Sequence, residues 1–192
     1  MKSLYSKEGE RLYCTAAEIN RFCEQADKCS EDVQLFCYVL ALTGVRISEA
    51  LALRKDHICT NPSHLVFETL KKRKRGIYRE VPVPSWFSSV LKQHFEALDP
   101  HDRLWNFGRT SAYLQVKDCF KRAGLTGENA SPKALRHSFA VNALACDVPL
   151  NMLQKWLGHS KIETTAIYAN ATGQEEQKIA KRMWIGARRV RR

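Results

Sequence analysis

The sequence lacks the features that would direct it to a membrane or stabilise it outside the cell. No apolar run is long enough to span a bilayer, and the N-terminus has no signal-peptide pattern. The seven cysteines are odd in number and scattered, without the short paired spacing of zinc sites. These absences argue against a membrane-spanning protein and a metal-stabilised module, and they predict a cytoplasmic protein with reduced, mostly buried thiols.

The chain also has no internal repeat, low-complexity linker or sign of a second domain. Its 192 residues carry a net charge of +11, and 44% of them are hydrophobic, which is enough for one packed core. This excess of positive charge favours binding to a polyanion such as nucleic acid, although a ribosomal or membrane-surface protein would show the same charge.

Local patterns predict a mainly α-helical domain with a small antiparallel β-hairpin, which is an α+β fold. Residues 15–18 (Thr-Ala-Ala-Glu) form a capping-box pattern that opens a first helix. Apolar residues at helical spacing predict a second helix that ends at Gly44. Arg46 and Glu49 lie three positions apart at the start of a third helix, close enough for the carboxylate to orient the guanidinium.

Two extended segments, residues 64–69 and 77–81, flank a strongly basic run and predict a β-hairpin with a basic tip. Most of this charge is expected to contact the phosphate backbone of a nucleic acid. The candidate backbone-binding residues are Lys71, Lys72, Arg73, Arg75 and Arg79.

Three more helices are expected after the hairpin. Two of them, over residues 85–97 and 110–124, would each begin with a serine or threonine cap. The third would begin at residues 131–132, where a serine cap precedes a first-turn proline. Lys133 and Arg136 share one face near its positive N-terminal end, which would attract a phosphate.

A short helix over residues 150–157 is expected to stop at Gly158. Ser160 and Glu163 then form a second capping-box pattern, which predicts another short helix leading to Tyr168. This tyrosine would therefore lie on a short helix that follows His159 in the sequence.

One tyrosine, one histidine and two arginines lie in distinctive local sequences, and together they indicate phosphoryl transfer. Arginine forks match the charged oxygens of a pentavalent phosphodiester, so Arg46 and Arg136 could clamp it. The hydroxyl of Tyr168 could then attack phosphorus and form a covalent phosphotyrosine, which conserves the bond energy. Such a scheme needs no ATP, metal or other cofactor, because the arginines supply the positive charge.

Three sequence blocks resemble the motifs of the tyrosine recombinase (phage integrase) family in composition, order and spacing. They are TGVRISEAL (residues 43–51), LRHSFA (135–140) and LGHSKIETTAIY (157–168). The resemblance implies the catalytic-domain fold of that family. It also implies a site-specific recombinase that cuts and rejoins DNA through a 3′-phosphotyrosine and a Holliday junction.

The resemblance assigns roles within these blocks. It implies that Arg46 and Arg136 clamp the scissile phosphate and that His159 forms a hydrogen bond to it. Tyr168 matches the family's nucleophile, and Glu49 is expected to support Arg46.

A lysine of the hairpin should, by the same resemblance, protonate the departing 5′ oxygen, because an alkoxide is a poor leaving group without an acid. Lys74 is the expected acid, since it stands at the family's interval before Arg79 and the Val-Pro pair at residues 81–82. Lys72 is the alternative.

The neighbours of Arg136 are harder to assign. The family commonly has histidine at the position of Lys133, as a candidate acceptor of the tyrosine proton. Lysine would serve either with a lowered pKa or as a further phosphate-binding cation, so the general base stays open. His137 points about 100° away from Arg136 around the helix, and we expect it to play a supporting or structural role.

The resemblance also implies partners and domain organisation. Residues 12–184 would form the catalytic domain, between a short tail (1–11) and a basic tail (185–192). Free monomers would assemble as a tetramer on two double-stranded DNA sites with inverted repeats, each exchanging a C-terminal helix over 174–184. Because only about ten residues precede the first helix, we expect no N-terminal core-binding domain, and a partner protein or cooperative binding would compensate.

Two other functions are compatible with the same residues. A type IB topoisomerase shares the active-site plan, but the block around Arg46 argues against it. A non-catalytic DNA-binding regulator of the same fold is disfavoured by the complete set of candidate catalytic residues. The small recombinases that invert DNA switches or act from mobile elements are a further likeness, by analogy alone.

Overall fold

The computed structural model describes residues 4–69 and 76–170. The basic tip of the predicted hairpin (residues 70–75), the predicted helix over 174–184 and the basic C-terminal tail lie outside these residues. Lys71, Lys72, Arg73, Lys74 and Arg75 belong to that tip, so their placement stays a prediction from the sequence.

The described residues form a mainly helical fold with one small antiparallel sheet, as predicted. The α-helices are α1 (Ala16–Ala26), α2 (Glu31–Thr43), α3 (Ile47–Leu51), α4 (Ser85–His94), α5 (Arg109–Arg122), α6 (Pro132–Ala145), α7 (Leu150–Leu157) and α8 (Glu163–Ala166). Two short 3-10 helices are η1 (Lys55–His57) and η2 (Ile167–Asn170). The strands are β1 (Ile58–Thr60), β2 (Ser63–Glu68) and β3 (Tyr78–Pro82).

Several helix ends follow directly from local sequence. The Thr15 side chain accepts a hydrogen bond from the Glu18 backbone, and the Glu18 carboxylate accepts one from the Thr15 backbone, which confirms the capping box of α1. Ser131 caps α6 by accepting from the Ala134 backbone at 3.2 Å. Gly44 and Gly158 end α2 and α7 with φ of 60° and 67°.

Other helix ends differ from the prediction. Pro84, not Ser85, occupies the N-cap position of α4, and this helix ends at His94. Gly108 replaces Thr110 as the N-cap of α5. The predicted cap of α8 by Ser160 was wrong, because Ile162 precedes that helix in a helical conformation and makes no side-chain cap.

The sheet has the order β1-β2-β3 with antiparallel pairing throughout. The predicted hairpin corresponds to β2 and β3, where Leu65 pairs with Val81 and Phe67 pairs with Arg79. All four side chains are buried, because alternate residues of a strand face the same side. The sequence did not reveal β1, whose three residues are too short for a period to show.

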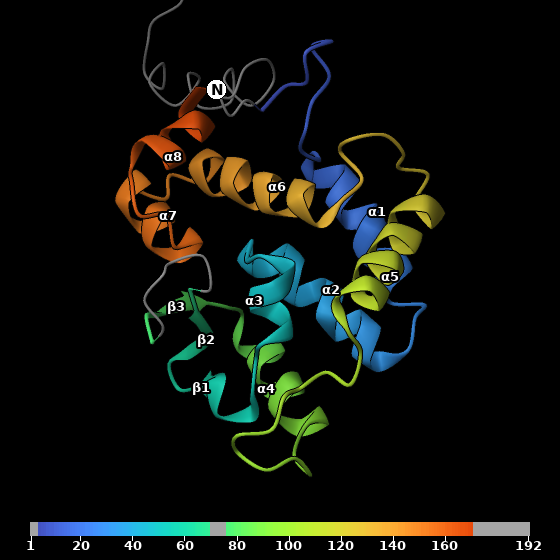
Figure 1. Cartoon of the computed structure of the whole chain (residues 1–192), viewed down its shortest axis with the longest axis vertical. Helices are drawn as coiled ribbons and strands as arrows, with labels where there is room; N and C mark the ends of the chain where they lie inside the picture. Colours follow the sequence, from blue (N-terminus) through green and yellow to red (C-terminus); the bar gives the residue numbers. More distant parts are fainter. Residues whose placement is uncertain (1–3, 70–75, 171–192) are drawn as a thin grey trace, which may run out of the picture.

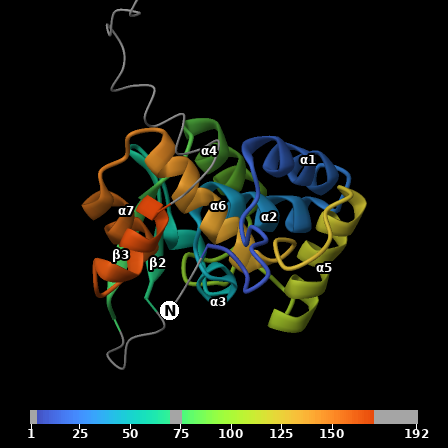
Figure 2. The same ribbon diagram turned by 90° about the horizontal axis from the view of Figure 1, so that it is seen from above.

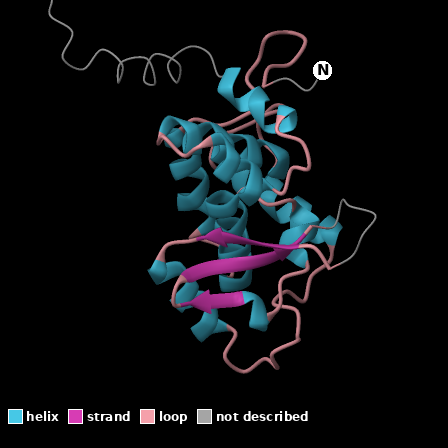
Figure 3. Ribbon diagram, turned by 90° about the vertical axis from the view of Figure 1, so that its left-hand side faces the viewer, coloured by secondary structure: helices cyan, strands magenta, loops and turns pink. Residues whose placement is uncertain are grey.

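In Figure 1, α6 lies across the upper part of the molecule, with α7 and α8 near one end and α1 and α5 near the other. The sheet lies in the lower half, beyond α7, and Figure 3 shows its three strands side by side. Figure 2 shows α7 close to β3 from a second direction, in agreement with the contact between these elements. The three motif blocks lie at the end of α2 and on α3, on α6, and from the end of α7 to η2, and α6 contacts α2, α7 and η2.

Two groups of buried apolar side chains hold this arrangement together. The larger one joins α1, α2, α4, α5 and the sheet, and includes Phe22, Phe36 and Leu65. The smaller one lies between α6, α7 and η2, and includes Leu153 and Tyr168. Burial of such side chains contributes about 1.5–3 kcal/mol each to folding. In the part of the chain that the structure describes, no helix combines the length and apolar character that crossing a membrane requires.

The seven cysteines are free thiols. The expectation that they would be mostly buried holds for Cys14, Cys37 and Cys119 and fails for Cys146, which is exposed. The other three are half-buried.

We predict that Gly44→Ala destabilises the fold more than Gly124→Ala does. Both glycines have φ in the left-handed region, at 60° and 70°, so alanine strains the backbone similarly at both positions. At Gly44 a Cβ would also lie 2.5 Å from the ring of Phe139 on α6, whereas at Gly124 it would meet nothing within 4 Å. We expect an extra loss of about 1–3 kcal/mol at Gly44 in urea unfolding. Equal losses would show that the α2–α6 contact tolerates the added methyl group.

Candidate active site

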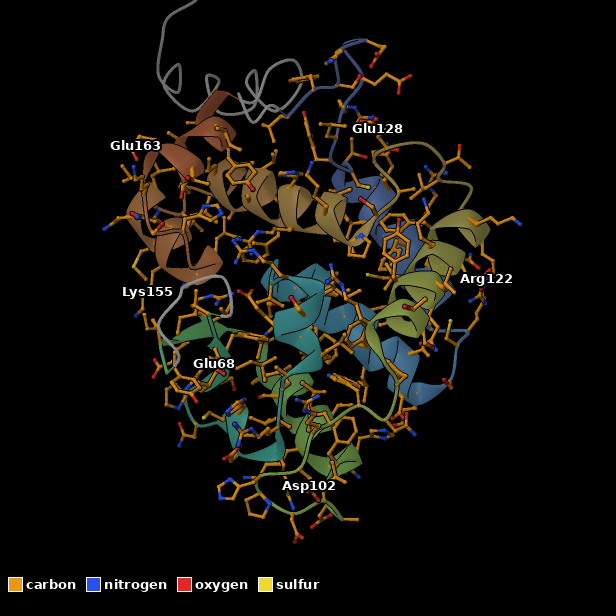
Figure 4. The ribbon with its side chains drawn as sticks, viewed as in Figure 1. Glu68, Asp102, Arg122, Glu128, Lys155 and Glu163 are labelled. Carbon is orange, nitrogen blue, oxygen red and sulfur yellow. The ribbon has the colours of Figure 1, made fainter. Side chains whose placement is uncertain are left out.

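Six residues singled out in the sequence line one open pocket. It lies between α3, the start of α5, the start of α6, His159 and the segment α8–η2. The residues brought together are Arg46, Lys133, Arg136, His137, His159 and Tyr168. Lys155 and Glu163, labelled in Figure 4, are exposed residues of α7 and α8 on the outer side of the molecule.

Arg136 is almost completely buried, with 7% of its surface exposed. Its Nη1 donates to the Gly44 carbonyl at 2.8 Å, and its Nη2 donates to the Leu157 carbonyl at 2.7 Å. Burial and the nearby charge of Arg46 lower the pKa of Arg136 to about 10, which leaves it charged at neutral pH. The guanidinium is therefore a fixed cation held by the ends of two helices.

His159 follows the glycine that ends α7 and contacts Arg136. Its Nε2 lies 3.0 Å from Arg136 Nη2, and its Nδ1 lies 2.9 Å from the Thr165 hydroxyl. Because a guanidinium has donors and no acceptor, Nε2 must accept this bond, so a neutral ring carries its proton on Nδ1. The His159 ring is nearly parallel to that of Tyr168, with ring centroids 6.4 Å apart.

Arg46 and the buried Glu49 form the ion pair that their spacing suggested. Arg46 Nη1 lies 2.9 Å from Glu49 Oε1, and the Arg46 backbone N–H donates to Oε2 at 3.0 Å. Burial opposes ionisation of Glu49, but the charges and hydrogen bonds of Arg79 and Arg46 outweigh it and hold its pKa below the usual value. Arg46 keeps part of its side chain exposed toward the pocket.

Arg79 was expected to contact the nucleic-acid backbone, but the structure buries it. Its Nη2 pairs with Glu49 Oε2 at 2.7 Å, its Nε donates to the Trp156 carbonyl at 2.7 Å, and its Nη1 donates to the Thr69 hydroxyl. The side chain lies on the inward face of β3, and only 6% of its surface is exposed. The sequence grouped it with the neighbouring basic run, whereas strand alternation turns it toward the core.

Tyr168 lies in η2, directly after α8, rather than on the predicted α-helix itself. It is 2% exposed, and its hydroxyl lies 3.0 Å from His137 Nδ1. Burial raises the pKa of Tyr168, and the positive charges of Arg136 and Arg46 reduce this rise. His137 thus contacts the hydroxyl of the candidate nucleophile directly. The sequence had predicted only a supporting or structural role for it.

Lys133 is exposed at the mouth of the pocket, one turn before Arg136. Sequence reasoning missed three other polar residues that line the same space, Ser48 on α3, Arg109 at the start of α5 and Thr164 on α8. Ser48 and Thr164 lie inside two of the motif blocks, where no role was assigned to them. Arg109 lies outside all three blocks, and the packing of α5 against α3 and α6 brings it to the pocket. Lys133 and Arg109 thus add two positive charges to those of Arg46 and Arg136, which makes the pocket suited to a phosphodiester.

Among residues 4–69 and 76–170, no group of three or more His, Cys, Asp or Glu side chains could hold a metal ion. The positive charge in the pocket comes from arginine and lysine side chains of the chain itself.

Comparison with known proteins shows the family to which the chain belongs. The model of the phage integrase family matches residues 11–175. The chain belongs to this family. A tyrosine recombinase of Thermosipho africanus is 30% identical over 150 residues, which cover 76% of this chain and 52% of the relative. The tyrosine recombinase XerD of Corynebacterium glutamicum is 32% identical over 158 residues, with coverage of 76% and 49%. This phage integrase family chain thus spans about half the length of these curated relatives.

Solved structures of recombinases show the same fold. The XerA recombinase matches with a TM-score of 0.74 at 24% identity, over 94% of this chain and 66% of that one. The catalytic domain of bacteriophage HP1 integrase matches with a TM-score of 0.67 at 24% identity, over 91% and 96%. The XerH recombinase, in a post-cleavage complex with palindromic difH DNA, matches at 26% identity with a TM-score of 0.73, over 98% and 57%.

We predict that Glu49→Gln in this family member costs about 3–5 kcal/mol of folding free energy at neutral pH, because it leaves the Arg79 charge buried without its partner. Asp118→Asn is the control, since it breaks an exposed pair with Arg122 and should cost less than about 1 kcal/mol. Both free energies are measured by urea unfolding.

The pH dependence of the unfolding free energy tests whether the charge of Glu49 is the cause of this loss. A carboxyl with a lowered pKa contributes its full stability above its usual value of 4.5 and loses it as pH falls through the lowered pKa. The gap between wild type and Glu49→Gln should therefore narrow as pH falls below about 4.5. A gap that stays constant in this range would mean that the charge of Glu49 is not what stabilises the fold.

Proposed function

We propose that the protein is a site-specific DNA recombinase that cuts and rejoins a DNA strand through a covalent bond between Tyr168 and phosphorus. The observation that carries this proposal is the pocket in which the Tyr168 hydroxyl shares one space with Arg46, Arg136 and His159. The XerH relative, bound to its DNA after cleavage, supports a DNA substrate for this chain as well.

In the proposed reaction, Arg46 and Arg136 bind the non-bridging oxygens of the scissile phosphate. Both are held in place by the fold, so the charge that develops on the phosphate meets donors that need no rearrangement. His159 donates a hydrogen bond to a phosphate oxygen once Nε2 carries a proton, in place of accepting from Arg136, and Lys133 adds a further cation at the mouth. These contacts strengthen as negative charge accumulates in the transition state.

The covalent step transfers the phosphoryl group from the 5′ oxygen to the hydroxyl oxygen of Tyr168. Tyr168 Oη attacks phosphorus and loses its proton, the bond from phosphorus to the 5′ oxygen breaks, and that oxygen takes a proton from the hairpin acid, Lys74. The products are a 3′-phosphotyrosine and a free 5′ hydroxyl. A 5′ hydroxyl from the partner strand reverses these steps, so two rounds pass through a Holliday junction without ATP or a metal.

The assembly we propose follows from this chemistry. Exchange between two duplexes requires two pairs of active sites, which favours a tetramer on two DNA sites with inverted repeats. Residues 174–184 are the candidate for a helix exchanged between protomers, and an accessory protein or cooperative binding could add affinity. The net charge of +11 predicts DNA binding that weakens steeply with salt.

We predict that Tyr168→Phe abolishes covalent adducts on a nicked suicide substrate while DNA binding survives within about threefold. Phenylalanine removes the nucleophilic oxygen but keeps the ring that packs in the core around η2. Tyr113→Phe is the matched control, because it removes an exposed tyrosine hydroxyl on α5. Adducts are detected by denaturing gel electrophoresis with labelled DNA. An adduct that persists in Tyr168→Phe would refute the assignment of the nucleophile.

The acid in the hairpin has its own test. We expect Lys74→Ala to slow cleavage of normal DNA by about 10²–10⁴-fold, because the 5′ alkoxide then departs without a proton. A substrate with sulfur in place of the bridging 5′ oxygen should restore the rate, since a thiolate leaves without an acid. Lys72→Ala is measured in parallel. Rescue of Lys72→Ala in place of Lys74→Ala would move the assignment to Lys72.

A further inference from the structure

The Tyr168 hydroxyl must lose a proton when it attacks, and its surroundings hold that proton strongly. The side chain is almost completely buried. Burial raises the pKa of Tyr168, and the charges of Arg136 and Arg46 offset only part of that rise. A group that accepts the proton during attack would therefore accelerate the reaction.

The other polar groups around the hydroxyl are poorly placed to accept this proton. Arg46 and Arg136 have only donors. Both ring nitrogens of His159 are hydrogen-bonded elsewhere, Nε2 to Arg136 and Nδ1 to Thr165. The Lys133 side chain is exposed to solvent, whereas Tyr168 is buried.

His137 is placed differently. Its Nδ1 lies 3.0 Å from Tyr168 Oη, with ring centroids 5.6 Å apart and the two planes inclined by 53°. The histidine is 7% exposed and lies near the centre of α6, where neighbouring turns fix its backbone. It also lines the same pocket as the arginines, so it lies beside the reacting oxygen and within the site.

We propose that His137 is the general base that takes the proton of Tyr168. This inference rests on the proposed recombinase function. Before attack, the neutral ring carries its proton on Nε2 and accepts the tyrosine O–H at Nδ1. As the bond between Oη and phosphorus forms, the proton moves from Oη to Nδ1 and the bond to the 5′ oxygen breaks. When the strand is rejoined, the proton returns from Nδ1 to Oη.

The charge that this step creates is balanced within the site. Proton transfer leaves an imidazolium on His137 next to Arg136, which would be unfavourable in an empty pocket. A phosphate bound by Arg46 and Arg136 brings negative charge to the same place. His137 therefore accepts the proton more readily when the substrate phosphate is bound. In the empty pocket the tyrosine stays protonated.

The same hydrogen bond would also exist if His137 only held the hydroxyl in place. Asparagine separates the two roles, because its Oδ1 can occupy nearly the position of histidine Nδ1 and accept the same hydrogen bond, but it takes up no proton near neutral pH. Alanine removes both functions and leaves a space that a small base can enter.

The test measures single-turnover formation of the phosphotyrosine on a suicide substrate with a bridging 5′ sulfur. This leaving group needs no acid, so the rate reports on the nucleophile alone. We expect His137→Asn to react about 10²-fold or more slowly than wild type while its thermal unfolding and DNA binding stay close to wild type. His137→Ala should be equally slow and should recover as imidazole is added. His94→Asn, which changes a half-buried histidine paired with Asp32 outside the pocket, should react at the wild-type rate.

The outcomes separate this inference from the proposed function. A His137→Asn protein that reacts within about threefold of wild type would show that hydrogen bonding suffices and would overturn the base assignment. A His137→Ala protein that reacts faster than wild type would overturn it too, because His137 would then restrain the tyrosine. If wild type itself forms no adduct, the recombinase proposal fails instead.

Discussion

The buried carboxylate of Glu49 is the interaction on which the site depends. A carboxylate removed from water is costly unless it is paired and hydrogen-bonded, so its partners must be in place together. Those partners are the guanidinium and backbone of Arg46 and the guanidinium of Arg79. Arg79 also binds the carbonyl of Trp156. One negative charge thus connects α3, the sheet and α7, and it fixes the distance between the first arginine and the segment that carries His159.

Arg136 is held by backbone carbonyl groups at the ends of two helices. The last carbonyls of a helix have no partner inside that helix, and Arg136 donates to two such groups, at Gly44 after α2 and at Leu157 in α7. Both helices end at a glycine in the left-handed conformation, which lets the chain turn sharply next to the guanidinium. The two arginines are therefore fixed before any phosphate arrives, as electrostatic catalysis requires.

The parts of the fold that sequence predicted are those that local interactions decide. The capping box of α1, the Ser-Pro start of α6 and the glycine ends of α2 and α7 each depend on residues within one helical turn. Arg79 was misassigned because its partner, Glu49, is 30 positions away and no local pattern reports that contact. The three residues of β1 escaped notice for a related reason, since their strand is defined by pairing with β2.

The site divides in the same way. The motif blocks identified Arg46, Arg136, His159 and Tyr168, and the fold brings all four to one pocket. The contact of His137 with Tyr168 spans 31 positions and depends on how η2 packs against α6. From the sequence, a rotation of 100° along the helix separates His137 from Arg136, which argued against a direct role. That rotation is what turns His137 toward the tyrosine while Arg136 faces His159.

The placement of these residues couples substrate binding to the reactivity of the tyrosine. In the empty pocket the arginines favour a tyrosine anion but oppose any new positive charge on a neighbouring ring, so the proton has little tendency to move to His137. A bound phosphodiester neutralises part of the arginine charge, and the imidazolium then becomes the easier state to form. The negative charge of the phosphodiester also makes a free phenolate on Tyr168 less stable. Loss of the tyrosine proton and attack on phosphorus are therefore favoured as one step. A site built from fixed arginines and a buried tyrosine can in this way keep its nucleophile protonated until a phosphate occupies the pocket.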